Sequence, residues 1–391
     1  MNTTHAPTTG ENFPCLDGLR GLAVISVAVF HTAYFNPAST WQNLLHSLTK
    51  SGWLGVPVFF VLSGFLISYT VMKQADRFDP YDYLIKRSAK IAPPFLLSLL
   101  IFGILAHLAF NTSGVFASAL AHFTTLAHFT TGWTVINPVY WSLMIEMHFY
   151  VLLPIIYLAL KRFVSNAEWI TFLLFATIPI VMRILTYLPP QTPVDIWQQN
   201  SNLFPKAMDN FALGILFAIV CRNRSRISHL ENFSGYLAAC GAALLVGCYL
   251  SYAFLQWKMA PPGGFYGGTI PIVFETYKLA PSLATFLLLF TIFLPSSHPI
   301  ALMLSCRPLQ FTGLISYEWF LFHYPPVLII GHMLGLPSGN PAIYAIRTVV
   351  PFVGSLAFSF VVWKYISNPI LMRAKAYLKT RAVTQRASKN P

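Results

Sequence analysis

Charged side chains are scarce in this sequence. Only 9% of its 391 residues are charged, 55% are hydrophobic, and the mean hydropathy is +0.60. A soluble globular domain carries roughly 25% charged residues, so this composition excludes an ordinary soluble protein. The net charge of +13 does not indicate nucleic-acid binding, because the basic residues lie between apolar segments, as in loops that face an anionic membrane surface.

Cysteine is equally rare. The five cysteines fall inside apolar segments or beside basic ends, where neither a disulfide framework nor a zinc site is expected; they are Cys15, Cys221, Cys240, Cys248 and Cys306. The sequence also has no zinc-peptidase helix, nucleophile elbow, phosphate loop or dinucleotide fingerprint, and we expect no metal. The N-terminal stretch has no basic region and no small-residue cleavage site, so no signal peptide is predicted.

Long apolar segments dominate instead. One membrane crossing takes about 20 apolar residues, and the pattern predicts about ten transmembrane helices, at 15–36, 53–73, 92–111, 138–160, 168–188, 205–221, 234–255, 272–294, 309–334 and 343–367. We interpret 115–131 as an eleventh, re-entrant or interfacial helix on the outer side. The expected fold is therefore a single all-α polytopic membrane domain over 1–391, with a polar tail at 1–13 and a basic tail at 368–391.

Lysine and arginine indicate the orientation of this domain. With ten crossings both termini share one side of the membrane, and 19 of the 25 basic residues fall on that side. The positive-inside rule then predicts that both termini are cytoplasmic. We see no internal repeat of the kind found in many transporters.

An ionisable residue inside a span is a functional candidate, because burying a charge in a bilayer is costly. Arg20 and His31 are eleven residues apart, which in a helix is three turns plus roughly 20° and about 16 Å of rise, so they share one face. A ligand whose anionic end binds Arg20 could present a reactive group to His31. The alternatives are an interfacial Arg20 paired with Asp17 and a His31 that only packs between helices.

Glu146 lies one turn after Ser142 and one turn before Tyr150, so the three residues form one stripe of a helix. The carboxylate could orient a histidine or hold an acceptor hydroxyl, or it could pair structurally with a buried Arg or Lys. His148 points away from the stripe and is interpreted as a packing residue.

His323 precedes two prolines, which free backbone carbonyls and can break a helix where protein or a cavity surrounds it. It is either a site residue or a structural partner. Two ion pairs near the outer surface are also predicted from i, i+3 spacing. They are Lys206 with Asp209 and Glu275 with Lys278.

Four motifs resemble those of the acyltransferase 3 family of membrane O-acyltransferases, in family order. They are LDGLRGLA at 16–23 followed by His31, GVPVFFVLSGFLI at 55–67, WSLMIEMHFY at 141–150, and SYEWFLFHYP at 316–325. The family usually has a cytoplasmic Arg-x-x-Arg, whereas residues 86–90 of this chain read KRSAK. Arg87 matches the first arginine of that motif, and Lys90 stands in place of the second. Lysine still offers a charge to a phosphate, although the bidentate fork of arginine is lost.

The resemblance implies transfer of an acyl group, by family habit acetyl, from acyl-coenzyme A to a hydroxyl of a cell-surface or periplasmic carbohydrate or a glycosylated metabolite. We assign catalysis to His31, Glu146 and His323, with His31 as the base because histidine titrates nearest neutrality. Other residues are assigned to binding: the donor by Arg20, Arg87 and Lys90, and the substrate by Trp141, Ser142 and Tyr150.

The expected location is the bacterial inner membrane, with lipids and a carbohydrate acceptor as partners and a monomer as the default state. A proton-coupled transporter that uses the intramembrane histidines and Glu146 as a relay is the alternative function. Ordinary positive-inside charge is the alternative interpretation of Arg87 and Lys90. The sequence indicates neither the acceptor nor whether an acyl-enzyme forms.

Overall fold

The chain is all-α. The computed structural model describes residues 13–33, 40–110, 114–125, 136–187, 204–223, 228–259, 271–335 and 341–389. Within these ranges the elements are helices and no strand is present, which confirms the expected fold class. Of the predicted N-terminal tail, only Phe13 is described.

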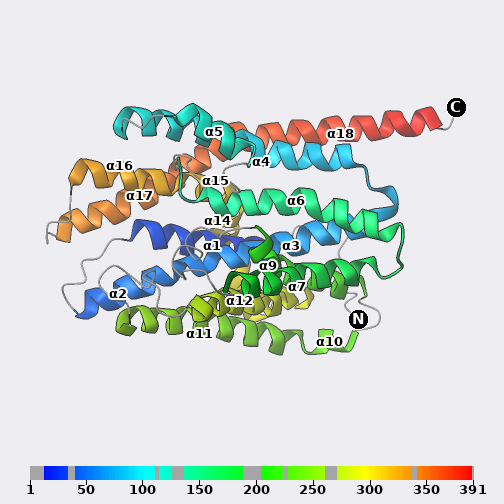
Figure 1. Cartoon of the computed structure of the whole chain (residues 1–391), viewed down its shortest axis with the longest axis horizontal. Helices are drawn as coiled ribbons and strands as arrows, with labels where there is room; N and C mark the ends of the chain where they lie inside the picture. The colour runs from blue at the N-terminus through cyan, green and yellow to red at the C-terminus, as the bar shows by residue number, and fades with distance from the viewer. Residues whose placement is uncertain are drawn as a thin grey trace.

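The helices run roughly parallel in one bundle (Figure 1). Their bounds are α1 Pro14–Thr32, α2 Thr40–Lys50, η1 Ser51–Leu54, α3 Gly55–Lys73, η2 Ala75–Arg77, α4 Pro80–Phe110, α5 Val115–Phe123, α6 Tyr140–Lys161, α7 Ala167–Tyr187, α9 Phe204–Arg222, α10 Ser228–Asn232, α11 Ser234–Met259, α12 Pro271–Leu288, η6 Leu289–Phe293, α13 Pro299–Leu304, α14 Arg307–Leu314, α15 Ser316–Phe322, α16 Tyr324–Leu334, α17 Pro341–Val362, the π-helical η7 Trp363–Ser367, and α18 Asn368–Lys389.

Eight helices in the described part of the chain are long and apolar enough to cross a membrane. The other two predicted spans are present as shorter pieces. The segment 272–294 forms α12 and the 3-10 helix η6, and 309–334 is divided among α14, α15 and α16. A count of ten crossings therefore stays a prediction.

Two basic segments that the sequence assigned to a loop and a tail are helical. Asp79 accepts hydrogen bonds from the backbone N–H groups of Tyr81 and Asp82, and Pro80 is the first helical residue, an arrangement that begins a helix. The helix α4 therefore starts at Pro80 rather than near residue 92, and the basic segment 86–90 lies on it. The predicted C-terminal tail forms α18.

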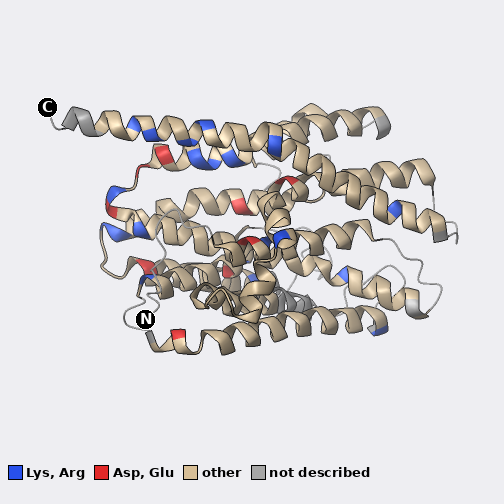
Figure 2. Ribbon diagram, turned by 180° about the vertical axis from the view of Figure 1, so that it is seen from behind, with Lys and Arg blue, Asp and Glu red and all other residues tan. Residues whose placement is uncertain are grey.

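The basic parts of α4 and α18 lie side by side at one end of the bundle. The helices α17, η7 and α18 belong to one 44-residue helical run, Ala342–Gln385, which is roughly 66 Å long at 1.5 Å per residue, whereas the hydrocarbon core is about 30 Å thick. The basic helix α18 must then project beyond the bilayer, beside the start of α4 (Figure 1). Lys and Arg gather at this end of the bundle (Figure 2), as the positive-inside rule predicts for the cytoplasmic side.

The short helix α5 has nine residues and is about 14 Å long, too short to cross a membrane. It packs against α4, and residues 126–131 of the predicted segment lie outside the described residues.

Asp209 forms an ion pair with Arg183 of α7, with 2.5 Å between Oδ2 and the guanidinium. The backbone carbonyl of Lys206 also accepts from Arg183, at 3.0 Å, and the predicted pairing of Asp209 with the Lys206 side chain stays a prediction. This pair ties α7 to α9. The side chains of Glu275 and Lys278 lie outside the described ones.

Candidate active site

The helix α1 carries two of the predicted site residues, and glycines bring it close to its neighbours. A Cβ atom on Gly18 would lie 1.6 Å from the carbonyl oxygen of Leu304, and one on Gly21 would lie 2.1 Å from that of Leu309. Only glycine permits such approach between helices. The two glycines of the first motif therefore fix the position of Arg20 and His31 relative to the helices that follow η6.

His31 and His323 contact each other, although 292 positions separate them in the sequence. His323 Nε2 is 2.9 Å from His31 Nδ1, and the ring centroids are 4.9 Å apart. His323 is fully buried, and the ring of Tyr324 covers His31 edge-on at 4.9 Å. The structure thus brings together two of the three predicted catalytic residues.

The hydrogen bonds of this pair assign the tautomers. His323 Nδ1 is 2.8 Å from the carbonyl of Phe320 and 3.1 Å from that of Trp319, and a carbonyl only accepts, so Nδ1 carries the hydrogen. In a neutral ring Nε2 is then an acceptor, and His31 Nδ1–H donates to it. His31 Nδ1 also lies 3.1 Å from the carbonyl of Val27. The lone pair of His31 is therefore on Nε2, which suits a proton acceptor.

The predicted break at His323 is present, since α15 ends at Phe322 and α16 begins at Tyr324. Pro325 has no N–H and cannot bond to the carbonyl of Leu321. The buried Asn137 takes its place, donating from Nδ2 to this carbonyl at 2.9 Å. The broken backbone is thereby satisfied by a side chain, and His323 is held beside His31.

We expect Asn137→Ala to lower the free energy of unfolding by about 1–3 kcal/mol, because it leaves a buried carbonyl without a partner. The measurement is the thermal midpoint in detergent. Asn223→Ala is the matched control, since Asn223 donates at 3.0 Å only to Ile219 of its own helix. Equal midpoints for the two variants would contradict this role of Asn137.

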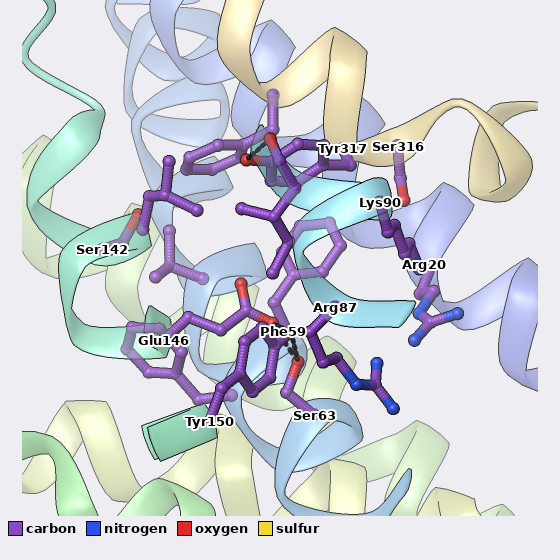
Figure 3. A pocket seen from close by; sticks show the side chains of 15 residues that line it. Arg20, Phe59, Ser63, Arg87, Lys90, Ser142, Glu146, Tyr150, Ser316 and Tyr317 are labelled. Atoms are coloured by element: carbon purple, nitrogen blue, oxygen red, sulfur yellow. Dashed lines mark hydrogen bonds between the residues drawn. The ribbon is translucent and has the colours of Figure 1, made fainter. Parts of the chain in front are cut away.

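Glu146 lies in a neighbouring cavity rather than beside the histidines. Its Oε1 accepts hydrogen bonds from the hydroxyls of Ser63 and Tyr150, and Figure 3 shows these three groups directed toward one another. All of the predicted stripe, Ser142, Glu146 and Tyr150, lines this cavity. The orienting partner of His31 is thus His323 and not the carboxylate.

The three predicted donor-binding residues line the same cavity. Arg20 comes from α1, whereas Arg87 and Lys90 come from α4. The guanidinium groups of the two arginines lie on one side of the cavity (Figure 3). Arg87 lies 5.5 Å from the ring centre of Tyr150 and 5.7 Å from that of Tyr83, a cation–π arrangement. Arg20 also makes the alternative contact with Asp17, at 3.6 Å.

A second hollow, which we call the inner vestibule, adjoins the cavity. Arg20, Arg87, Lys90, Ser316 and Tyr317 line both; the vestibule is further lined by Asp17, Lys86, Gly313, Leu314, Glu318, Trp363, Ser367, Asn368, Leu371 and Lys375. The space inside the cavity that a water molecule can occupy is about 70 Å³, so the cavity is narrow as it stands.

One aromatic ring, that of Phe320, lies next to both the cavity and the histidine pair. Phe59 and Phe320 line the cavity, with ring centroids 6.0 Å apart. The ring of Phe320 is 5.7 Å from that of His323. His31 and His323 are not among the residues that line the described cavity.

Other predicted residues have supporting positions. Trp141 lies behind Phe60, a cavity residue, with ring centroids 6.5 Å apart. His148 contacts Thr125 at 3.2 Å and the ring of Phe204, as expected of a packing residue.

The sequence interpretation missed Ser63. Its hydroxyl stands in the apolar motif 55–67, and this isolated polar group was the available signal. In the part of the chain that the structure describes, no group of three or more His, Cys, Asp or Glu is placed to hold a metal ion.

Comparison with known proteins agrees with the four motifs. The family model described as an acyltransferase domain, Acyl_transf_3, matches residues 13–364. The chain is similar to the peptidoglycan O-acetyltransferase of Listeria monocytogenes, with 22% identity over 91% of this chain and 55% of that protein. It is also similar to an O-acetyltransferase of Staphylococcus aureus, with 23% identity over 91% of this chain and 57% of that protein.

The chain therefore spans about half the length of these relatives. No solved structure matches it. The matched family and the named relatives are acyltransferases, and nothing among them supports the alternative of a proton-coupled transporter. Because the family model covers nearly the whole chain, including the helices that carry both the histidine pair and the cavity, the chain belongs to the acyltransferase 3 family.

Proposed function

We propose that the chain transfers an acyl group, most simply acetyl, from coenzyme A at the cytoplasmic face of the bacterial inner membrane to a hydroxyl of a carbohydrate on the other side. The observation that supports this proposal is that one cavity shares three basic residues with the vestibule and, through the ring of Phe320, lies next to the histidine pair. The names of the relatives favour acetyl transfer and a cell-wall glycan as acceptor.

The basic residues suit the donor. Coenzyme A is a polyanion that does not cross lipid readily, so its phosphates would stay at the basic end of the bundle. Arg20, Arg87 and Lys90 line both the vestibule and the cavity, and cations at that junction would hold the phosphates while the uncharged pantetheine arm enters the cavity.

The histidine pair suits proton transfer. His31 Nε2 would take the proton of the acceptor hydroxyl while the hydroxyl oxygen bonds to the thioester carbonyl carbon. The tetrahedral intermediate would then collapse with cleavage of the carbon–sulfur bond, and His31 would return the proton to the leaving thiolate. The products are an ester and free coenzyme A. His323 would keep the His31 ring in its tautomer by accepting from Nδ1–H.

This chemistry requires the thioester to reach His31 past Phe320, which lines the cavity next to His323. The side chain of Phe320 would turn aside to admit the thioester, and Phe59, which packs against it with ring centroids 6.0 Å apart, would move with it.

We propose that the acceptor contacts Ser142 and Tyr150 in the cavity. Trp141 would support this site by packing against Phe60, which lines the cavity. Glu146 would act with them, since it already holds two hydroxyl groups, those of Ser63 and Tyr150. A sugar hydroxyl could replace one of them. Both termini would be cytoplasmic and the enzyme would work as a monomer in contact with membrane lipids.

The donor can be tested without knowing the acceptor. We expect coenzyme A to raise the thermal midpoint of the detergent-purified protein in a saturable way, because a ligand that binds only the native state stabilises it. The shift should weaken in Arg87→Ala and survive in His31→Ala. Arg162→Ala is the matched control, since Arg162 lies at the exposed end of α6 and lines neither hollow.

Two results would count against the proposal. One is a well-folded protein whose midpoint does not move at coenzyme A concentrations far above its cellular level. The other is a shift that Arg87→Ala and Arg162→Ala reduce equally, since binding would then depend on general basic charge and not on the cavity.

A further inference from the structure

The C-terminal helix α18 forms one wall of the inner vestibule. Asn368, Leu371 and Lys375 line it, and their spacing of three and four residues places them on one helix face. Leu378, one turn after Lys375, is also turned toward the protein and is 4% exposed. A terminal segment that looks like a solvated basic tail in sequence therefore turns a defined stripe toward the protein.

This stripe is docked on the start of α4. Arg381 forms ion pairs with Asp79, at 2.9 Å, and with Asp82. The hydroxyls of Tyr377 and Tyr81 are 3.3 Å apart. Because Asp79 is the residue that caps α4, Arg381 connects α18 to the beginning of the helix that carries Arg87 and Lys90. The position of Lys375 is thus set by contacts on its C-terminal side.

The vestibule gathers more positive than negative charge. Its lining includes the cations Arg20, Lys86, Arg87, Lys90 and Lys375 but only two carboxylates, Asp17 and Glu318. Asp17 is already paired with Arg20. Among the described residues, Lys86 and Lys375 form no ion pair, and both side chains are exposed to solvent. Like charges converging on one hollow repel one another, and a polyanion would relieve this repulsion.

The cations are also arranged in depth. Arg20, Arg87 and Lys90 line both the cavity and the vestibule, whereas Lys86 and Lys375 line only the vestibule. In a donor whose thioester enters the cavity, the end farthest from the thioester would lie at the mouth. In coenzyme A that end is the nucleotide with its 3′-phosphate.

We propose that α18 is part of the donor site and that Lys375, with Lys86, binds the 3′-phosphate of coenzyme A. Arg381 is a positioning residue that holds Lys375 there through α4. The proposal rests on the proposed function, and it makes the 3′-phosphate a determinant of which thioesters the enzyme accepts.

The test compares coenzyme A with 3′-dephospho-coenzyme A on the full-length protein in detergent, by titration calorimetry. The wild type should bind coenzyme A more tightly. Lys375→Ala should weaken coenzyme A binding about 3- to 10-fold and leave dephospho-coenzyme A nearly unaffected, so the ratio of the two affinities falls toward one. Lys375→Arg keeps the charge and should keep the ratio.

Lys379→Ala is the matched control, because Lys379 is an exposed lysine one turn further along α18 that does not line the vestibule. Its ratio should equal that of the wild type. Arg381→Ala should lower the ratio with Lys375 still present, a change that a purely structural loss would not produce.

Two outcomes would overturn the inference and leave the proposed function intact: equal wild-type affinities for the two compounds, or identical ratios in Lys375→Ala and Lys379→Ala. Absence of coenzyme A binding by the wild type would overturn both proposals together. The thermal midpoint of each variant without ligand separates lost binding from lost folding.

Discussion

Replacing His31 by alanine is expected to reduce acyl transfer roughly 100- to 10,000-fold while coenzyme A binding persists. That range is the usual contribution of a positioned general base. The hydrogen bonds of the pair leave the lone pair of His31 on Nε2, and its removal leaves the acceptor hydroxyl without a base. Turnover in membranes, together with the thermal shift on coenzyme A, separates catalysis from binding.

His323→Ala should cost less activity than His31→Ala. The base remains, but its ring loses the partner at 2.9 Å that fixes its tautomer, and only the carbonyl of Val27 still accepts from Nδ1. His323→Gln should restore part of the activity, because its amide oxygen can accept in place of Nε2. If His323 served only in helix packing, His323→Gln would recover no activity relative to a His323→Ala protein of equal stability.

Glu146 is the rival base, since it lines the cavity itself. Glu146→Gln keeps a hydrogen-bonding group of the same size and removes the basicity. If Glu146→Gln abolished turnover in a folded protein while His31→Ala kept most of it, the assignment of His31 as the base would be wrong. We expect His31→Ala to lose more turnover than Glu146→Gln.

The second large effect is expected at Gly18. Gly18→Ala should destabilise the protein by about 3 kcal/mol or more, at or above the upper end of ordinary overpacking. The new Cβ would lie 1.6 Å from the carbonyl oxygen of Leu304, a backbone atom that no side-chain rotation can move. The helices would have to separate, and Arg20 and His31 would move with α1. The readouts are the yield of monodisperse protein and its thermal midpoint.

Gly247→Ala is the control for this substitution. Gly247 also lies inside a membrane helix, α11, but no atom stands within 4 Å of its added Cβ. Its midpoint should equal or exceed that of the wild type, because alanine favours a helix more than glycine does. A Gly18→Ala protein as stable as Gly247→Ala would show that α1 does not depend on this close approach.

Within single helices, the sequence predicted the local arrangement of the candidate residues. The shared face of Arg20 and His31, the stripe of Ser142, Glu146 and Tyr150, and the break at His323 all follow from local spacing and from proline chemistry. The membrane class and most spans follow equally from composition, because the bilayer requires long apolar segments.

The location of Glu146 could not be obtained in this way. Glu146 is 83 residues from Ser63, and His31 is 292 residues from His323. The spacing of residues along one helix says nothing about which neighbour that helix meets. The start of α4 at Pro80 is a different case. Asp79-Pro80 is a helix-start signal in the sequence, but the first turns of α4 are polar, so an apolar span begins only near residue 92.

What the sequence by itself determined is therefore a membrane acyltransferase with its motifs, the faces of its helices and its basic end. Only the tertiary structure decided that His323 and not Glu146 contacts His31, that Phe320 lies next to both the cavity and His323, and that α18 reaches the vestibule. The physical reason is that helix periodicity is set by backbone geometry, whereas helix pairing is set by contacts such as Gly18 on Leu304, between residues far apart in the chain.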